Sequence, residues 1–146
     1  MFEFGCQRVL EPTNCFPQPA WKLDNTMAVY ENEIMVDVEI IHVNTTSFEQ
    51  ILASENGNLS GIKKRIFEIV NARGKLQNPI TGTGGILYGR VEQIGKAYPN
   101  PFGLAVGDAV ITLASLSLTP LRLDDIDEIK LASGQLKVRG KAILFG

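Results

Sequence analysis

The chain has 146 residues, of which 45% are apolar and 21% charged, and this is the composition of one folded domain with its own hydrophobic core. Its 14 basic and 16 acidic residues give a net charge of −2, so charge offers no reason to expect nucleic acid or an acidic membrane as a partner. The two cysteines and the single histidine are too few for a typical zinc site.

The start of the chain carries an acid and lacks the apolar stretch of a signal peptide. The longest apolar-leaning run, residues 109–118, is interrupted by hydroxyl side chains and is shorter than the ~20 residues of a membrane-spanning helix. We therefore expect a cytoplasmic protein with reduced thiols and no membrane partner.

Residues 11–19 contain three prolines, which predict an extended surface arm. The clearest strand follows at residues 33–44, where apolar side chains occupy the even-numbered positions. We take that face as the inward one. Because His42 and Asn44 continue it, both are predicted to point inward at the end of the strand.

Two helices are predicted next. Ser47 and a glutamine three residues later resemble a capping box, which opens a short helix that stops near Gly57. A second helix is predicted to run from Ser60, as its N-cap, to Arg73, because its isoleucine and valine residues fall on one helical face and Gly74 follows it.

Strand patterns return after residue 77. Loops are predicted at residues 78–85 and 95–103, and residues 121–130 are compatible with a strand or a short helix. Strands are predicted at residues 86–94, 109–114, 136–138 and 142–145. Strands, a helical pair and strands again predict a mainly β fold, a barrel or a sandwich with a two-helix insertion. Since the last apolar strand stops one residue before the end, we expect the chain to be the N-terminal part of a longer protein.

Three stretches, residues 33–48, 78–95 and 104–110, hold a long strand, a proline–glycine loop before a strand, and a Val-Gly-Asp turn. Their order and spacing resemble the GroES-like catalytic domain of the medium-chain dehydrogenases. The resemblance implies a GroES-like partly open β-barrel over residues 1–146. It also implies that the cofactor-binding Rossmann domain lies outside this chain, since no G-x-G-x-x-G pattern here leads into a helix.

A narrower resemblance extends over nearly the whole chain. It is carried by residues 10–12, 17–20, 23–25, 81–85 and 115–122, which look like the L-erythro-3,5-diaminohexanoate dehydrogenase family of lysine fermentation. This resemblance implies oxidative deamination of the 3-amino group of the small-molecule substrate, giving 5-amino-3-oxohexanoate, ammonia and NADH. The chain would then be the substrate-side domain, with NAD bound mainly by the rest of the protein, and we expect the domain alone to be inactive.

Zinc-dependent members of the superfamily carry a cysteine where Asn44 stands and a His-Glu pair near Thr83 and Gly84. An amide, a hydroxyl and a glycine offer no adequate zinc ligands. We therefore predict no catalytic metal.

Eight residues are candidates for the site, and each has a structural alternative. Asn44, Thr45 and Ser47 are expected to line the cleft if the family register holds, and strand-end or N-cap chemistry is their alternative. Asn44 and His42 are the candidates for catalysis, although a lone inward histidine is also a common core residue. Helix capping explains Ser47 equally well, and stabilisation of the loop explains Thr81 and Thr83. Turn chemistry explains Ser117 and Thr119. The candidates for contact with substrate are Thr45, Ser47, Thr81, Thr83, Ser117 and Thr119.

Two rival functions stay open: a zinc-free domain of the quinone-reductase type and a co-chaperonin-like structural module. In this superfamily the chain returns to the barrel after the cofactor domain. A chain without that segment would leave an unpaired strand edge, so we expect self-association into a homo-oligomer. The general base and the residues that pair the charged groups of the substrate are not assigned.

Overall fold

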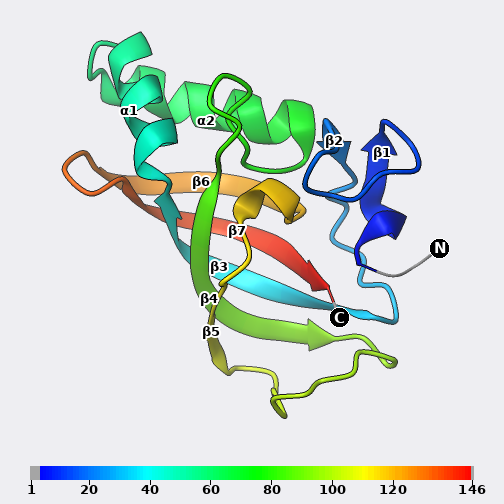
Figure 1. The fold of residues 1–146 in the computed structure, drawn as a ribbon. Helices are drawn as coiled ribbons and strands as arrows, with labels where there is room; N and C mark the ends of the chain where they lie inside the picture. The colour runs from blue at the N-terminus through cyan, green and yellow to red at the C-terminus, as the bar shows by residue number, and fades with distance from the viewer. Residues whose placement is uncertain (1–3, 146) are drawn as a thin grey trace.

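The computed structural model describes residues 4–145 as a curved, open five-stranded sheet with two helices and a small amino-terminal hairpin packed beside it (Figure 1). This confirms the predicted mainly β class and the two-helix insertion, and an open sheet is what a partly open barrel requires. Neither α-helix in the described part is long and apolar enough to cross a membrane. In chain order the elements are η1 (Cys6–Arg8), β1 (Val9–Glu11), β2 (Lys22–Leu23), β3 (Glu33–Val43), α1 (Thr45–Ser54), α2 (Leu59–Arg73), β4 (Gly85–Ile94), β5 (Ala109–Ile111), η2 (Leu116–Leu118), β6 (Leu121–Lys130) and β7 (Gln135–Phe145).

The five strands are antiparallel and lie in the order β5-β4-β3-β7-β6. The ambiguous residues 121–130 form a strand, β6. The two short strands predicted near the end are one continuous strand, and the strand predicted at residues 109–114 ends at Ile111. Strand β7 pairs on both sides, with β3 and β6, so the last strand is not an unpaired edge. The edges of this sheet are β5 and β6.

The predicted face of β3 is correct for only half of the strand. Val38 pairs with Gly89 of β4, and Ile40, two residues later, pairs with the adjacent residue Tyr88. Strand β3 therefore contains one extra residue between Val38 and Ile40. Such a β-bulge reverses which side chains face the core. Buried apolar positions are therefore even-numbered up to Val38 and odd-numbered from Ile41 onward. His42 and Asn44 are exposed, and the prediction that they point inward is wrong.

The helix starts also differ from prediction. The side chain of Asn44 caps α1 by accepting a hydrogen bond from the N–H of Thr46 at 3.0 Å, so the capping box at Ser47 is wrong. Asn58 caps α2 in the same way, accepting from the N–H of Gly61 at 2.9 Å, where Ser60 was expected. The predicted end of α2 is confirmed, because Gly74 follows it with a φ of 68°.

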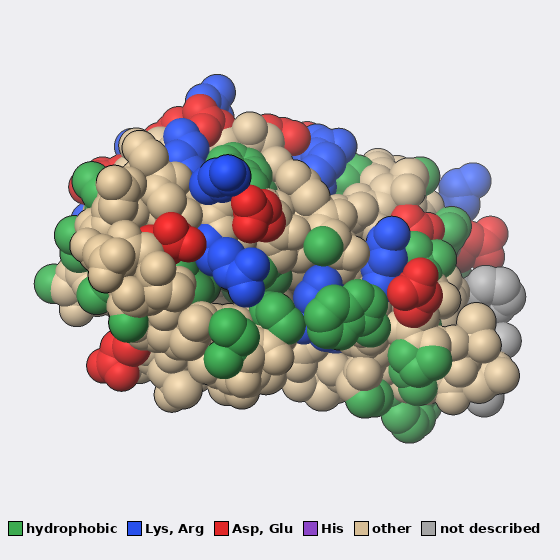
Figure 2. All heavy atoms as spheres, turned by 90° about the horizontal axis from the view of Figure 1, so that it is seen from above, with side chains coloured by type: hydrophobic (Ala, Val, Ile, Leu, Met, Phe, Trp, Pro, Cys, Tyr) green, Lys and Arg blue, Asp and Glu red, His purple; other side chains and the backbone are tan. Residues whose placement is uncertain are grey.

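The hydrophobic core lies between the sheet and the helices. The predicted apolar face of α2 is confirmed: Ile62, Ile66, Ile69 and Val70 are all buried and belong to the same cluster as the inner side chains of β3, β6 and β7. Figure 2 shows the face seen from above, where acidic and basic side chains are interspersed and no large area of one sign forms.

A buried ion pair holds the amino-terminal segment. Arg8 and Glu33 are fully buried, and two N–H groups of the guanidinium donate to the carboxylate at 2.9 and 2.7 Å. The other three guanidinium hydrogens are directed at main-chain carbonyl oxygens of Asp24, Thr26 and Ala28. All five donors are therefore satisfied, which is the condition for an arginine to be stable without water.

The proline-rich arm is irregular, as predicted, but parts of it are covered: Pro17 and Ala20 are buried. Two cations hold it, one at the last position of α2 and one shortly after the helix. Arg73 donates to the carbonyl oxygen of Trp21 at 2.8 Å and stacks over its ring at 4.1 Å. Lys75, with no exposed surface, donates to the carbonyl oxygen of Pro17 at 2.9 Å. The arm is thereby packed against the end of α2.

Candidate functional site

A polar depression of about 300 Å³ brings together three of the predicted site residues, Asn44, Thr83 and Ser117, from three distant stretches of the chain. It lies where α1 begins, where residues 78–84, the glycine loop, lead into β4, and beside η2. Its lining is made of Gln18, Asn44, Gly82, Thr83, Gly84, Gly85, Ile86, Leu113, Ser115 and Ser117. We take this depression as the candidate active-site wall.

The glycine loop is fixed to the other walls by main-chain contacts. The N–H of Asn44 donates to the carbonyl oxygen of Gly84 at 2.7 Å. A Cβ atom at Gly84 would lie 2.5 Å from the carbonyl oxygen of Leu76 and 2.9 Å from the amide nitrogen of Ser117. At Gly85 a Cβ would collide with the carbonyl oxygen of His42. Only glycine allows this loop to pass so close to η2 and the end of β3.

The two loop threonines contact each other: their hydroxyl oxygens are 3.0 Å apart. Asn78 holds the base of the loop, because its N–H donates to the carbonyl oxygen of Thr83 at 2.9 Å and its own carbonyl accepts from Gly82 at 2.7 Å. Both threonines are half-buried. Thr83 lines the depression and Thr81 does not, so a contact of Thr81 with substrate stays a prediction.

Asn44 lies at the edge of the depression, with its side-chain oxygen occupied by the cap of α1. The oxygen of the amide is therefore held in place, and the residue as a whole is exposed. The amide is not the buried group that the periodicity predicted. A catalytic role for it stays a prediction.

The other predicted site residues lie elsewhere. His42 is exposed on β3 and does not line the depression, and Thr45 is exposed in the first turn of α1. Ser47 is buried in α1, and its hydroxyl has no hydrogen-bond partner among the described residues. Thr119 is buried and donates to the carbonyl oxygen of Ser115 at 3.1 Å, which is the turn chemistry given as its alternative.

Sequence reasoning missed Gln18 and Lys75. The hydroxyl of Ser117 donates to the side-chain oxygen of Gln18 at 2.5 Å. The ammonium of Lys75 donates to the carbonyl oxygens of Gln18 and Ser117 at 3.2 and 2.7 Å. Burial and then the neighbouring Arg73 guanidinium lower the pKa of Lys75 to about 8, against a smaller opposite effect of the Cys15 thiol. No local pattern marks either residue, because both are brought to the site by contacts across 42 residues or more.

The depression is polar but uncharged at its surface: amides and hydroxyls line it, and none of its ten lining residues is acidic or basic. Within residues 4–145, no group of three or more His, Cys, Asp or Glu side chains converges in a way that could hold a metal ion. The arrangement can therefore orient a polar ligand by hydrogen bonds.

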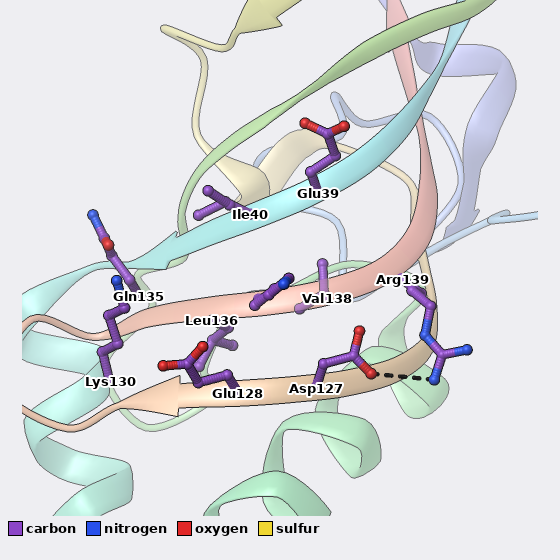
Figure 3. Close-up of a pocket in the computed structure, with 10 residues that line it drawn as sticks. Glu39, Ile40, Asp127, Glu128, Lys130, Gln135, Leu136, Val138 and Arg139 are labelled. Carbon is purple, nitrogen blue, oxygen red and sulfur yellow. Dashed lines mark hydrogen bonds and ion pairs between the residues drawn. The ribbon is translucent and has the colours of Figure 1, made fainter.

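A second depression, of about 380 Å³, lies where β3, β7 and β6 run side by side (Figure 3). Three of its charged residues, Glu39, Asp127 and Arg139, form ion pairs. Arg139 contacts Asp127 at 3.1 Å, as the dashed line in Figure 3 marks, and Asp125 at 2.6 Å, while Glu39 is 3.5 Å from Arg90. It contains none of the predicted site residues, and we assign no function to it.

Comparison with known proteins identifies the family of the chain. The family model described as "L-erythro-3,5-diaminohexanoate dehydrogenase N-terminal domain" matches residues 7–146. The chain belongs to this family.

Two curated relatives are named L-erythro-3,5-diaminohexanoate dehydrogenase, one from Acetoanaerobium sticklandii and one from Fusobacterium nucleatum. Each is 46% identical to the chain over 143 residues, which is 98% of the chain. The match covers 42% and 41% of the relatives' own lengths, so the chain spans about two fifths of the proteins that it matches. The family predicted from the sequence motifs is thus confirmed.

Proposed function

We propose that this chain is the substrate-side domain of an NAD-dependent dehydrogenase that oxidatively deaminates L-erythro-3,5-diaminohexanoate in lysine fermentation. The proposal rests on family membership together with one structural observation. Asn44, the glycine loop with Thr83, and Ser117 line a single depression. Those are the stretches that carry the family resemblance, and they are far apart in the sequence.

The reaction divides into two steps. Hydride leaves C3 of the substrate for the nicotinamide while the nitrogen loses a proton, which gives an imine, NADH and one proton. Water then adds to the imine carbon, and ammonia leaves as the 3-oxo product forms. NAD supplies the hydride acceptor when it is bound. We place its main binding site in the rest of the protein, because no glycine-rich strand–turn–helix occurs in the described residues.

The role of this domain is to hold the substrate beside the cofactor. Hydrogen bonds from fixed amides and hydroxyls orient C3, and orientation of two bound reactants accounts for a large share of such a rate acceleration. The substrate carries two ammonium groups, so acidic partners are needed. The surface of the depression has none, and we assign the acidic groups to the remaining part of the protein. The domain alone is then inactive.

The proposal is tested by assaying the full-length protein and residues 1–146 in parallel for NADH formation from L-erythro-3,5-diaminohexanoate. We expect turnover by the full-length protein and none by residues 1–146. A quinone assayed with NADH serves as the control for the rival reductase function. Faster quinone reduction than diamino acid oxidation, or NADH formation by residues 1–146 alone, would contradict the proposal.

A further inference from the structure

One buried cation, Lys75, lies directly behind the wall of the depression, and the Arg73 guanidinium lies close enough to it to lower its pKa. Lys75 is completely buried and Arg73 is 6% exposed. All the hydrogen bonds found for their charged groups end on main-chain carbonyl oxygens, and within residues 4–145 neither forms an ion pair with a carboxylate. Carbonyl dipoles satisfy the donors of a cation but leave its net charge in place. The wall therefore has uncompensated positive charge behind it.

The position of that charge is fixed by the fold. The ammonium of Lys75 contacts the carbonyl oxygens of Gln18 and Ser117, and both residues line the depression. A charge surrounded by protein is screened less than one in water, so its attraction for an anion at the wall is strengthened.

The hydrogen bonds at the surface of the wall also favour an anion. The side-chain oxygen of Gln18 can only accept, so the single proton of the Ser117 hydroxyl is directed at it. The Ser117 hydroxyl oxygen also lies 2.7 Å from that of Ser115. This leaves the amide nitrogen of Gln18, an exposed residue, with two hydrogens at the end of this series of hydrogen bonds. For that nitrogen no hydrogen bond is found among the described residues.

We propose that this wall, formed by Gln18, Ser115 and Ser117 in front of Lys75, binds an anionic group of a ligand. The inference deepens the proposed function: the anion is either the carboxylate of the diamino acid or a phosphate of the dinucleotide, and both are oxyanions that accept hydrogen bonds. Gln18 donates to it, and the buried charge attracts it. Lys75 is a positioning residue, since its three donors are already used.

The test uses the full-length protein with acetate and inorganic phosphate as inhibitors. Acetate competing with the diamino acid assigns the wall to the substrate carboxylate, and phosphate competing with NAD assigns it to the cofactor. Gln18→Glu keeps the acceptor for Ser117 but puts a negative charge at the wall, so we expect it to raise the inhibition constant about tenfold. Gln93→Glu is the matched control, because it makes the same change at an exposed position of β4 outside the depression, and we expect no effect.

Failure of competition by both anions, or equal effects of the two variants, would overturn the inference. If the full-length protein does not oxidise the diamino acid, the proposed function fails, but the anion site is still testable. Amide chemical shifts of Ser115 and Ser117 in the full-length protein are then followed during titration with each anion. Shifts that persist in Gln93→Glu and vanish in Gln18→Glu support the site, and their absence from the unsubstituted protein overturns it. Lys75→Met, if it folds, is expected to weaken the same shifts.

Discussion

The main-chain N–H of Asn44 donates to the carbonyl oxygen of Gly84 at 2.7 Å, and the side chain of the same asparagine caps α1. One residue thus joins the end of β3, the start of α1 and the glycine loop. Part of the lining of the depression comes from these points, and the rest comes from the segment around η2 and from the proline-rich arm. Its shape therefore depends on a few local contacts, which makes several consequences measurable.

Asn44→Ala removes the cap of α1 and is expected to lower the free energy of unfolding by about 1 kcal/mol. Asn44→Asp keeps a capping oxygen, so its stability is expected to stay within about 0.5 kcal/mol of the wild type. It replaces the amide nitrogen with a charged oxygen, and if that nitrogen serves substrate, kcat/KM of the full-length protein falls about tenfold or more. Urea unfolding and steady-state kinetics separate the two roles. Full activity in the aspartate variant would limit Asn44 to capping.

Gly84→Ala is expected to cost about 2–3 kcal/mol, because the added methyl group meets main-chain atoms of Leu76 and Ser117 that cannot move independently. Gly57→Ala is the comparison, since Gly57 has a φ of 71° and no atom within 4 Å of a new Cβ. Its cost is limited to backbone strain of about 1 kcal/mol. Equal losses of stability in the two variants would show that the glycine loop is not tightly packed.

Arg8→Met leaves the Glu33 carboxylate buried without its cation, and the expected loss of stability is about 3–5 kcal/mol. The double variant Arg8→Met, Glu33→Met removes both charges and is expected to be more stable than Arg8→Met alone. Denaturant unfolding of the single and double variants completes a mutant cycle. Additive losses would mean that the two groups do not depend on each other.

The lowered pKa of Lys75, about 8 in the folded protein, predicts a specific pH dependence of stability. The unfolded chain holds this proton up to about pH 10.4, so between roughly pH 8 and 10.4 it binds a proton that the folded protein does not. The free energy of unfolding of the wild type therefore rises with pH over this window, relative to Lys75→Met. Arg73, which favours loss of the proton, and Cys15, which opposes it, are unchanged in the comparison. If the free energy of unfolding of the wild type, relative to that of Lys75→Met, stays constant or falls from pH 8 to 10, the lowered pKa of Lys75 is contradicted.

The sequence predicted the elements well wherever the pattern was regular and local. The alternation in the first half of β3, up to Val38, and the apolar face of α2 were both correct, since each follows from the geometry of a single element. The bulge in β3 was not predictable, because it depends on how its neighbours pair, and it moved His42 and Asn44 from the inner to the outer side. Both helix starts were placed at serines although nearby asparagines cap them.

The site was predicted in part. Family motifs brought Asn44, Thr83 and Ser117 to one place, and the structure puts all three around the depression. Gln18 and Lys75 were missed because their position depends on how the proline-rich arm packs, and no spacing in the sequence indicates that. A buried lysine whose donors all end on carbonyl oxygens has no signature before the fold is known.

The most direct measurement is a crystal structure of the full-length protein with NAD and L-erythro-3,5-diaminohexanoate. Our account predicts that the diamino acid lies in the depression, in contact with Thr83 and Ser117 and with C3 facing the nicotinamide. A diamino acid bound instead at the charged depression of β3, β7 and β6, or entirely within the remaining part of the protein, would contradict it.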